Sequence, residues 1–420
     1  MGHLPGRAKL VVGSSPHSSA WRAALLTQFS TLKHFSTEPE AALDQLQSFF
    51  EKHLVDDGLL GAPGELQGQP SRWTSFVADD HSLLEYSLAI SHSYTRLRLG
   101  FEPAPIQVVS QTSRDWQTDP INILAPLQWT RRHGAPGPRT DLTWFQALLP
   151  VLTVMPSDTI PKKAFGFTQL AFGVELHSSE IMMKAYFGLD AKAIAEGRCK
   201  EDIVEEALAG IQLRQSWLPI RSYLCDLQRA GKPAALESCG VDCVPSDQAR
   251  MKLYIRFSRI DLQELEKHLD CKGHTDRKVF ESQKIWAREL FTLFDEKREQ
   301  VIECADSDLS AQEARSRGAL VYYELRKGTT APTAKFYLPI RQDAADDDDV
   351  VQKLDGFLFS RGLREAGWYR RLVQQFVTHR ALAKRSGVQS NIGCAYKKGI
   401  PELTVYLATE LYAPERPWMI

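Results

Sequence analysis

Three short stretches of the chain alternate apolar with polar residues and share the pattern Lys-x-Tyr. They read Met183-Lys184-Ala185-Tyr186-Phe187, Met251-Lys252-Leu253-Tyr254-Ile255 and Ala334-Lys335-Phe336-Tyr337-Leu338. A period of two is typical of a β-strand, so Lys and Tyr are predicted to share one face and the apolar residues the other. A fourth stretch, Leu403 to Leu407, carries Tyr406 without the Lys. We interpret these stretches as copies of one functional strand.

A strand face made of Lys and Tyr is unusual, because an exposed strand is expected to carry mixed Glu, Ser and Thr. In the second stretch Arg250 precedes Lys252 and Tyr254 on the same face. If such strands lie in one sheet, their ammonium groups and rings converge on a cationic, aromatic-walled surface. If the sheet closes into a barrel, the same residues line its interior.

The remaining periodicity predicts further strands and helices. Strands are predicted at 83–94, 95–101, 165–176, 182–189, 243–257, 318–326, 331–341, 390–396 and 402–408. Helices are predicted at 38–55, 141–152, 201–217, 262–268, 285–294, 350–358 and 368–384. The repeating order of strand, strand, helix, helix favours one antiparallel sheet with helices on one face. Residues 1–20, rich in Gly, Pro, Ser and His, are predicted to be loose, and residues 21–420 to form a single domain.

Composition narrows the class of protein. Of the 420 residues 43 % are hydrophobic and 25 % charged, which is enough for a large globular core. The 51 basic and 52 acidic residues leave a net charge of −1, so any basic cluster is local and wholesale nucleic-acid binding gains no support. We expect no membrane span or signal peptide, because no apolar run is long enough. Seven scattered Cys favour reduced thiols, and hence a cytoplasmic location.

Two further motifs complete a family resemblance. With Leu84-Glu85-Tyr86-Ser87 and Arg98-x-x-Phe101-Glu102-Pro103, the Lys-x-Tyr strands resemble the dimethylallyl-tryptophan-synthase-type aromatic (indole) prenyltransferases, over about residues 75 to 410. The resemblance implies the α+β PT barrel, or ABBA fold, in which ten antiparallel strands enclose a chamber with helices outside. It also implies metal-independent transfer of a dimethylallyl group from dimethylallyl diphosphate to an indole-type or polycyclic acceptor in secondary metabolism, such as indole alkaloid biosynthesis. The pattern alone does not predict barrel closure.

The resemblance assigns roles to residues of this chain. Permanent cations suit a diphosphate leaving group, because they form strong charge-assisted hydrogen bonds. The predicted diphosphate-binding residues are Arg98, Lys184, Arg250, Lys252, Lys335 and Lys398. The predicted shield of the allylic cation, by cation–π attraction and exclusion of water, is Tyr186, Tyr254, Tyr337, Tyr396 and Tyr406. Glu85 is predicted to hydrogen-bond the acceptor and to accept or relay its proton.

Two positions depart from the family members that prenylate tryptophan at C4. Ala171 stands where those members carry a Lys, and Gly188 stands four residues after Lys184, where a Tyr is expected. Both positions lie on the acceptor side. We therefore do not expect free L-tryptophan to be the acceptor, or C4 to be the position of attack.

Several alternatives stay open at this level. The same chemistry could use a longer prenyl donor or a phenolic or polyketide acceptor, and the enzyme could be a monomer or a homodimer. A nucleic-acid-binding module would place Lys and Tyr on an open sheet, whereas a closed chamber would exclude that function. The run Asp346 to Asp349 is predicted to be a solvated loop rather than a magnesium site. No metal ligand set is expected.

Overall fold

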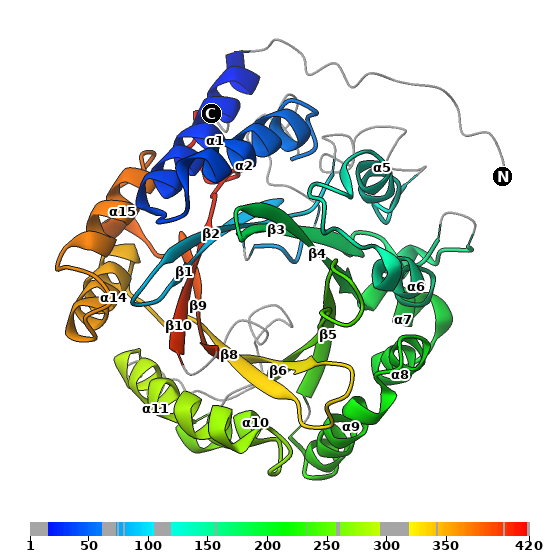
Figure 1. Cartoon of the computed structure of the whole chain (residues 1–420). Helices are drawn as coiled ribbons and strands as arrows, with labels where there is room; N and C mark the ends of the chain where they lie inside the picture. Colours follow the sequence, from blue (N-terminus) through cyan, green and yellow to red (C-terminus); the bar gives the residue numbers. More distant parts are fainter. Residues whose placement is uncertain are drawn as a thin grey trace.

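The computed structural model describes residues 16–60, 73, 75–78, 80–104, 119–155, 158–232, 234–257, 261–294, 319–341, 343–397 and 400–417. Within these ranges ten antiparallel strands close into a barrel, and helices surround it (Figure 1). The strands are β1 (Leu84–Ile90), β2 (Thr95–Phe101), β3 (Leu170–His177), β4 (Glu180–Gly188), β5 (Ala234–Asp242), β6 (Met251–Phe257), β7 (Ala319–Leu325), β8 (Thr333–Pro339), β9 (Gln389–Lys397) and β10 (Ile400–Ala408). The ten-strand PT barrel expected from the resemblance is confirmed.

Each strand pairs with its neighbours in sequence, and β10 closes the ring by pairing with β1. The strands of each hairpin, β1–β2, β3–β4, β5–β6, β7–β8 and β9–β10, are joined by short connections at one end of the barrel. We call this the hairpin end. Between consecutive hairpins the chain crosses the outside of the barrel, and this is where most of the described helices lie. The strand, strand, helix, helix order therefore follows from the topology.

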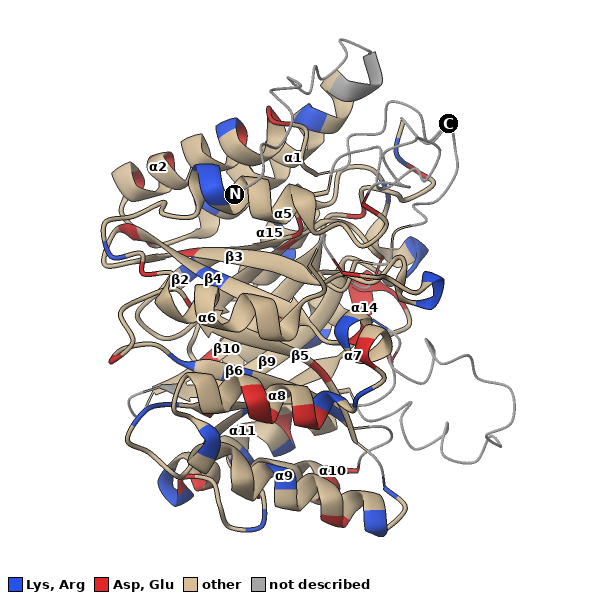
Figure 2. Cartoon of the chain, turned by 90° about the vertical axis from the view of Figure 1, so that its right-hand side faces the viewer, with Lys and Arg blue, Asp and Glu red and all other residues tan. Residues whose placement is uncertain are grey.

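The described helices pack on the outer faces of the strands. They are α1 (Pro16–Phe35), α2 (Glu40–Phe50), the π-helical η1 (Glu51–Val55), α5 (Leu124–His133), α6 (Thr143–Leu152), η2 (Lys162–Ala164), α7 (Asp190–Glu196), α8 (Lys200–Gly210), α9 (Arg214–Arg229), α10 (Leu262–Asp270), α11 (Arg277–Leu293), α14 (Asp347–Ser360), α15 (Trp368–Phe376) and η4 (Leu382–Lys384). Their apolar sides meet outward-facing strand residues; the ring centroid of Trp129, for example, lies 4.6 Å from that of Phe172 and 5.1 Å from that of Phe101. Charged residues of both signs lie on outer helices such as α8 (Figure 2). Among the helices described, none combines the length and apolarity that crossing a membrane requires.

The structure adds elements that the periodicity did not predict. Strand β5 was missed because small and polar residues dilute its alternation, and a register shift between Leu236 and Ser238 interrupts it. Helix α1 begins at Pro16, inside the segment expected to be loose; residues 1–15 lie outside the described ranges. The predicted helix 201–217 is two helices, because Gln212 adopts a φ of 64° between α8 and α9.

The prediction of a solvated loop at Asp346–Asp349 is wrong. Asp346 is the N-cap of α14, and its side chain accepts a hydrogen bond of 2.9 Å from the backbone N–H of Asp349. Asp347 is fully buried, accepts backbone N–H groups of residues 387–389 and forms an ion pair with Arg380. Carboxylates are stabilised by the unpaired N–H groups and positive dipole end of a helix N-terminus. The run therefore starts a helix and anchors a neighbouring segment.

Candidate active site

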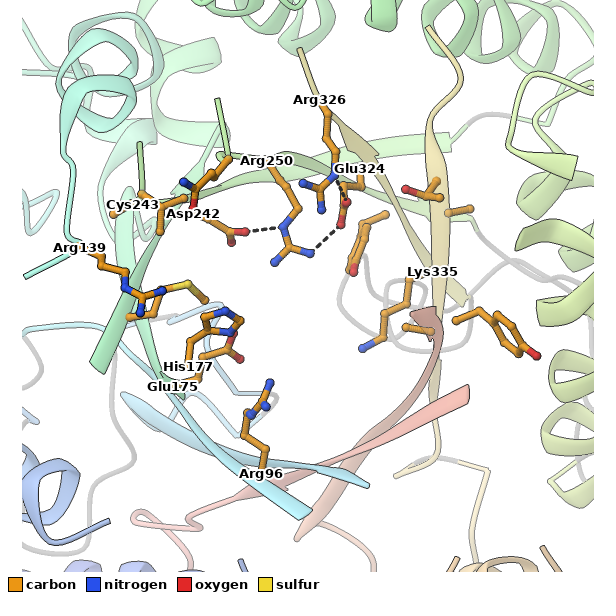
Figure 3. Close-up of a pocket in the computed structure, with 18 of the residues that line it drawn as sticks. Arg96, Arg139, Glu175, His177, Asp242, Cys243, Arg250, Glu324, Arg326 and Lys335 are labelled. Atoms are coloured by element: carbon orange, nitrogen blue, oxygen red, sulfur yellow. Dashed lines mark hydrogen bonds and ion pairs between the residues drawn. The ribbon is translucent and has the colours of Figure 1, made fainter. Parts of the chain in front are cut away.

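The Lys and Tyr residues of the three repeated stretches face the interior of the barrel. A cavity of about 560 Å³ lies there, bordered by Arg96, Glu175, Asp242, Arg250, Glu324 and Lys335, among others. Figure 3 shows Arg250 reaching into this cavity between Asp242 and Glu324, with Lys335 entering it from another strand. The convergence predicted from the period-two pattern is thus confirmed, and the polar face is an enclosed one.

Along each of these strands the chemistry changes in the same order. Strands β4, β6, β8 and β10 all run away from the hairpin end, so Lys184, Lys252 and Lys335 lie nearer to that end than the Tyr two residues later. Glu85 is the second residue of strand β1, opposite Gly100 and Ala408, and lies toward the far end. The chamber therefore has a charged layer, then a tyrosine layer, then a carboxylate.

The first group of cations is held by two glutamates that the sequence analysis did not single out. Nε of Arg98 lies 2.6 Å from a carboxylate oxygen of Glu175, and Nη2 lies 3.1 Å from Glu402. Nζ of Lys184 lies 2.8 Å from the other oxygen of Glu175. Burial alone would lower the pKa of Arg98, but Glu402 and Glu175 raise it above its usual value.

The second group of cations is built around Asp242. Nζ of Lys252 donates to Asp242 over 2.7 Å, while Arg250 bridges Asp242 and Glu324, with 2.9 Å to Glu324. Burial alone would raise the pKa of Asp242, but Lys252 and Arg250 hold it below its usual value. Burial lowers the pKa of Lys252, and although Asp242 opposes the shift, Arg250 and Lys184 add to it.

The presence of carboxylates beside these cations has a physical reason. Several cations brought together away from water would repel one another and lose hydration, and facing carboxylates offset both costs. The sequence did carry a signal for them: Glu175, Glu324 and Glu402 occupy polar positions at even spacing on their strands. Asp242 was missed together with strand β5. Most of the positive charge of the site is therefore offset before a substrate arrives.

Lys335 connects the charged layer to the tyrosine layer. Its Nζ donates to the hydroxyl of Thr404 over 3.1 Å and lies 4.8 Å from the ring centroid of Tyr337 and 6.0 Å from that of Tyr406. Both distances are typical of cation–π contacts. The Tyr337 and Tyr406 rings are therefore able to stabilise a carbocation in the tyrosine layer, farther than Lys335 from the hairpin end.

The tyrosines form one continuous aromatic cluster. Ring centroids are 6.2 Å apart for Tyr186–Tyr254, 6.3 Å for Tyr254–Tyr337 and 5.5 Å for Tyr337–Tyr406. The sequence analysis missed Tyr322, which lies 5.4 Å from Tyr254 and 5.9 Å from Tyr337. Tyr322 could have been found from its spacing of two from Glu324. Burial raises the pKa values of these phenols, so the rings stay neutral.

Two predicted site residues are not brought into these layers. Tyr396 pairs with Pro401, whereas its neighbour Ala395 pairs with Glu402 on the chamber side. Alternation thus directs Tyr396 away from the tyrosine cluster, although it borders the cavity near the hairpin end. Lys398 lies outside the described residues. Their roles remain predictions.

Glu85 is positioned by a hydrogen bond from β9, which is separated from β1 only by β10. The hydroxyl of Ser390, on β9, donates to Glu85 Oε1 over 2.7 Å. Opposite Glu85, Gly100 leaves room, since a Cβ built there would meet its nearest atoms only at 3.9 Å.

The two departures from the tryptophan-4 pattern border the same region. Ala171 pairs with Tyr186, so the position expected to carry a Lys lies directly beside the tyrosine layer. A Cβ on Gly188 would lie 2.1 Å from the carbonyl oxygen of Thr168 and 3.1 Å from the ring of Phe76. A tyrosine therefore cannot replace Gly188 without moving the backbone. Phe76 is held there by a 3.2 Å hydrogen bond from its N–H to the Thr168 hydroxyl.

In the Arg98-x-x-Phe101-Glu102-Pro103 motif, Glu102 has a structural role. The buried carboxylate of Glu102 accepts hydrogen bonds from Trp73 at 3.0 Å, Asn122 at 3.0 Å and Thr168 at 2.7 Å. Thr168 in turn accepts a hydrogen bond from the N–H of Phe76, so Glu102 and Phe76 share this partner. Arg98, three residues before Phe101, faces the chamber instead.

Comparison with known proteins identifies the relatives of this barrel. Residues 17–371 match the sequence profile of tryptophan dimethylallyltransferase. The chain belongs to the tryptophan dimethylallyltransferase family. It is 27 % identical over 409 residues to 4-O-dimethylallyl-L-tyrosine synthase of Claviceps purpurea, covering 94 % of this chain and 88 % of that protein.

Other relatives of this dimethylallyltransferase extend the comparison. Over 364 residues it is 24 % identical to 7-dimethylallyltryptophan synthase of Aspergillus fumigatus, covering 81 % of this chain and 73 % of that protein. The crystal structure of AnaPT from Neosartorya fischeri matches the fold with a TM-score of 0.76 at 20 % identity, over 94 % of each chain. As a member of the family, the chain described here is an aromatic prenyltransferase that transfers a dimethylallyl group to an aromatic acceptor.

The closed chamber excludes the alternative function of a nucleic-acid-binding module, which requires an open sheet.

Proposed function

We propose that the layers of the chamber correspond to the steps of prenyl transfer from dimethylallyl diphosphate, without a metal ion. The diphosphate binds among Arg98, Lys184, Arg250, Lys252 and Lys335, near the hairpin end. The dimethylallyl group lies among the tyrosine rings, and the acceptor ring lies beyond it, beside Glu85. The observation that supports this order most is the shared direction of β4, β6 and β8, on which Lys precedes Tyr.

In this mechanism the allylic C–O bond breaks first, and both bonding electrons leave with the diphosphate. The cations stabilise the negative charge that develops on the leaving oxygen, as preorganised donors do in other enzymes. Tyr254, Tyr322 and Tyr337 stabilise the allylic cation and exclude the water that would capture it. The acceptor then attacks the cation, and its lost proton passes to Glu85 or through it to solvent.

The cation set is the reason to propose independence of metal. In many phosphoryl-type reactions a divalent ion neutralises the oxygens, whereas in this proposal basic side chains bind the leaving group. When the diphosphate arrives, it competes with Glu175 and Asp242 for these donors. In this scheme the transferred prenyl group is a C5 unit. The space on the acceptor side of the chamber would decide whether a longer prenyl donor also fits.

For the acceptor we propose an aromatic amino acid or a derivative whose ring N–H or O–H binds Glu85. A phenol is one candidate, because the likeness to 4-O-dimethylallyl-L-tyrosine synthase covers nearly the whole chain. An indole is the other, and the family profile supports it. With Ala171 and Gly188 on the acceptor side, attack at C4 of free tryptophan is not expected.

An acceptor panel tests this function. The purified enzyme is incubated with dimethylallyl diphosphate and, separately, tyrosine, tryptophan, Trp-containing cyclic dipeptides, indole terpenoids and phenolic polyketides. Mass spectrometry is expected to find one added C5 unit on at least one acceptor, and fragmentation then locates it on oxygen or carbon. Absence of product from every acceptor, with geranyl diphosphate tried as a second donor, would contradict the proposal.

Replacing Glu85 with Gln is expected to lower kcat/KM for the acceptor by about 10- to 100-fold, because a hydrogen bond to a charged group is lost. The Kd of dimethylallyl diphosphate, measured by calorimetry, should change little. As a control, Glu237→Gln changes a glutamate whose partner is Arg256, and it should leave both values as in the wild type. If diphosphate affinity falls with Glu85→Gln, the carboxylate belongs to the charged layer instead.

In the chamber without substrate, burial lowers the pKa of Lys252 from its ordinary 10.5 to about 7. The affinity for dimethylallyl diphosphate is therefore expected to decrease as the pH rises from about 7 to 10.5. The bound diphosphate favours the ammonium form of Lys252, so Lys252 takes up a proton when the diphosphate binds above pH 7. Because protons become scarcer as the pH rises, the affinity falls. Calorimetry in two buffers of different ionisation enthalpy measures this uptake. The Lys252→Gln variant should show a flatter profile; an identical slope would show that another group titrates.

We further propose a cytoplasmic enzyme whose active site needs no second subunit. The six described cysteines are free, as expected under reducing conditions. All of the predicted site residues that the structure describes belong to one barrel, so a monomer and each half of a homodimer would both carry a complete chamber. Light scattering of the active enzyme, with activity measured across dilution, checks this.

A further inference from the structure

A cluster of three metal-binding side chains lies outside the barrel, at the junction of two helices. His53 belongs to η1, Asp57 follows its end, and His133 is the last residue of α5. One ligand atom from each lies within 4.8 Å of the others, and His133 Nε2 lies 3.5 Å from Asp57 Oδ2. The two imidazole rings are 4.0 Å apart at an angle of 37°. Nothing in the prenyl-transfer chemistry uses these residues.

We propose that His53, Asp57 and His133 bind a divalent transition metal ion, with Zn²⁺ as the preferred species. Two imidazole nitrogens and a carboxylate oxygen form a donor set that suits Zn²⁺, with one coordination position left for water. In a tetrahedral site with bonds near 2.0 to 2.2 Å, donor atoms are about 3.3 Å apart. The His133–Asp57 separation is already close to this, and the half-exposed His53 ring can rotate to meet it.

Two helix ends at the cluster favour a cation, whereas the nearby Lys52 and Arg132 oppose one. His133 ends α5, and Asp57 follows the end of η1, so the negative ends of two helices meet at the cluster. Phe49 lies 5.4 Å from His53, and Trp129 lies 6.1 Å from His133, which gives each imidazole an apolar neighbour on its own helix.

The expected consequence is structural. The continuous helix of α2 and η1 lies beside α5 near strands β2 and β3 (Figure 1), and Phe49 already contacts Trp129 at 6.2 Å. A metal ion bound by both helices cross-links them and stabilises the folded state by its binding energy. Turnover should not depend on it, because the charged layer lies inside the barrel.

Calorimetric titration of metal-free full-length enzyme with ZnCl₂ tests the proposal. We expect one saturable site in the wild type, a higher melting temperature with Zn²⁺, and binding at least about tenfold weaker in His133→Gln and in His53→Gln. His34→Gln, at an exposed histidine of α1, is the matched control and should bind like the wild type. Circular dichroism checks that each variant is folded.

A second readout does not depend on stability. Co²⁺ in a four-coordinate site absorbs visible light far more strongly than hydrated Co²⁺, so the wild type and His34→Gln should gain intense bands that both cluster variants lack. If the wild type binds Zn²⁺ no more tightly than His133→Gln, and Co²⁺ gives no such bands, the cluster is not a metal site. Equal loss of binding in His34→Gln would overturn it as well.

Discussion

Replacing Lys252 with glutamine is expected to lower kcat for prenyl transfer by about 100- to 1,000-fold. Lys252 is buried, fixed by Asp242 at 2.7 Å, and lies two residues before Tyr254 on β6. A donor fixed in this way can stabilise the leaving diphosphate with little reorganisation, and removal of one such donor typically costs this factor. Steady-state kinetics with the best acceptor measure the effect.

The matched control for Lys252→Gln is Lys163→Gln, at an exposed lysine of η2. Because Lys252→Gln leaves Asp242 with fewer partners, the melting temperature of this variant is recorded. The double variant Asp242→Asn/Lys252→Gln removes both charges. We expect the double variant to recover stability but not turnover. Wild-type kcat in Lys252→Gln would remove Lys252 from the diphosphate site.

Replacing Asp347 with alanine is expected to lower the free energy of unfolding by about 3 to 5 kcal/mol. The side chains of Asp347 and Arg380 are both fully shielded from water, so the change leaves a buried guanidinium with one carboxylate fewer. It also removes the acceptor for the backbone N–H groups of Val388 and Gln389, just before and at the start of β9. Urea unfolding followed by fluorescence measures the loss.

The adjacent Asp348 is the control for this experiment. Its side chain is 39 % exposed and pairs with Arg370 at 2.6 Å, so Asp348→Ala should cost less than about 1 kcal/mol. The two variants remove the same group from neighbouring positions of one helix. Equal losses of stability would contradict the account of Asp347 as a buried anchor.

The strands that carry the site could be predicted because their chemistry is local. Lys184 with Tyr186, Lys252 with Tyr254, and Lys335 with Tyr337 each occur within three residues, and the period of two places them on one face. Closure of the barrel could not be predicted in this way. It depends on the pairing of β1 with β10, such as Glu85 with Ala408, across more than 300 residues of sequence.

The carboxylates of the chamber show a second limit. The sequence analysis treated the cations as partners of the diphosphate alone, yet Glu175, Asp242 and Glu324 bind them in the structure. The cost of burying like charges becomes apparent only when the barrel brings them together. Asp347 is a similar case, because a run of four aspartates gives no sign of which one will be buried.

The central claim is that the cations of the chain take the place of a metal ion in prenyl transfer. The most direct test is the initial rate of C5 transfer from dimethylallyl diphosphate to the best acceptor in excess EDTA, with and without Mg²⁺ added beyond the chelator. The account predicts that the rate in EDTA equals the rate with free Mg²⁺, even if EDTA lowers the melting temperature by removing Zn²⁺ from the outer site. Loss of transfer in EDTA, restored by Mg²⁺, would contradict it.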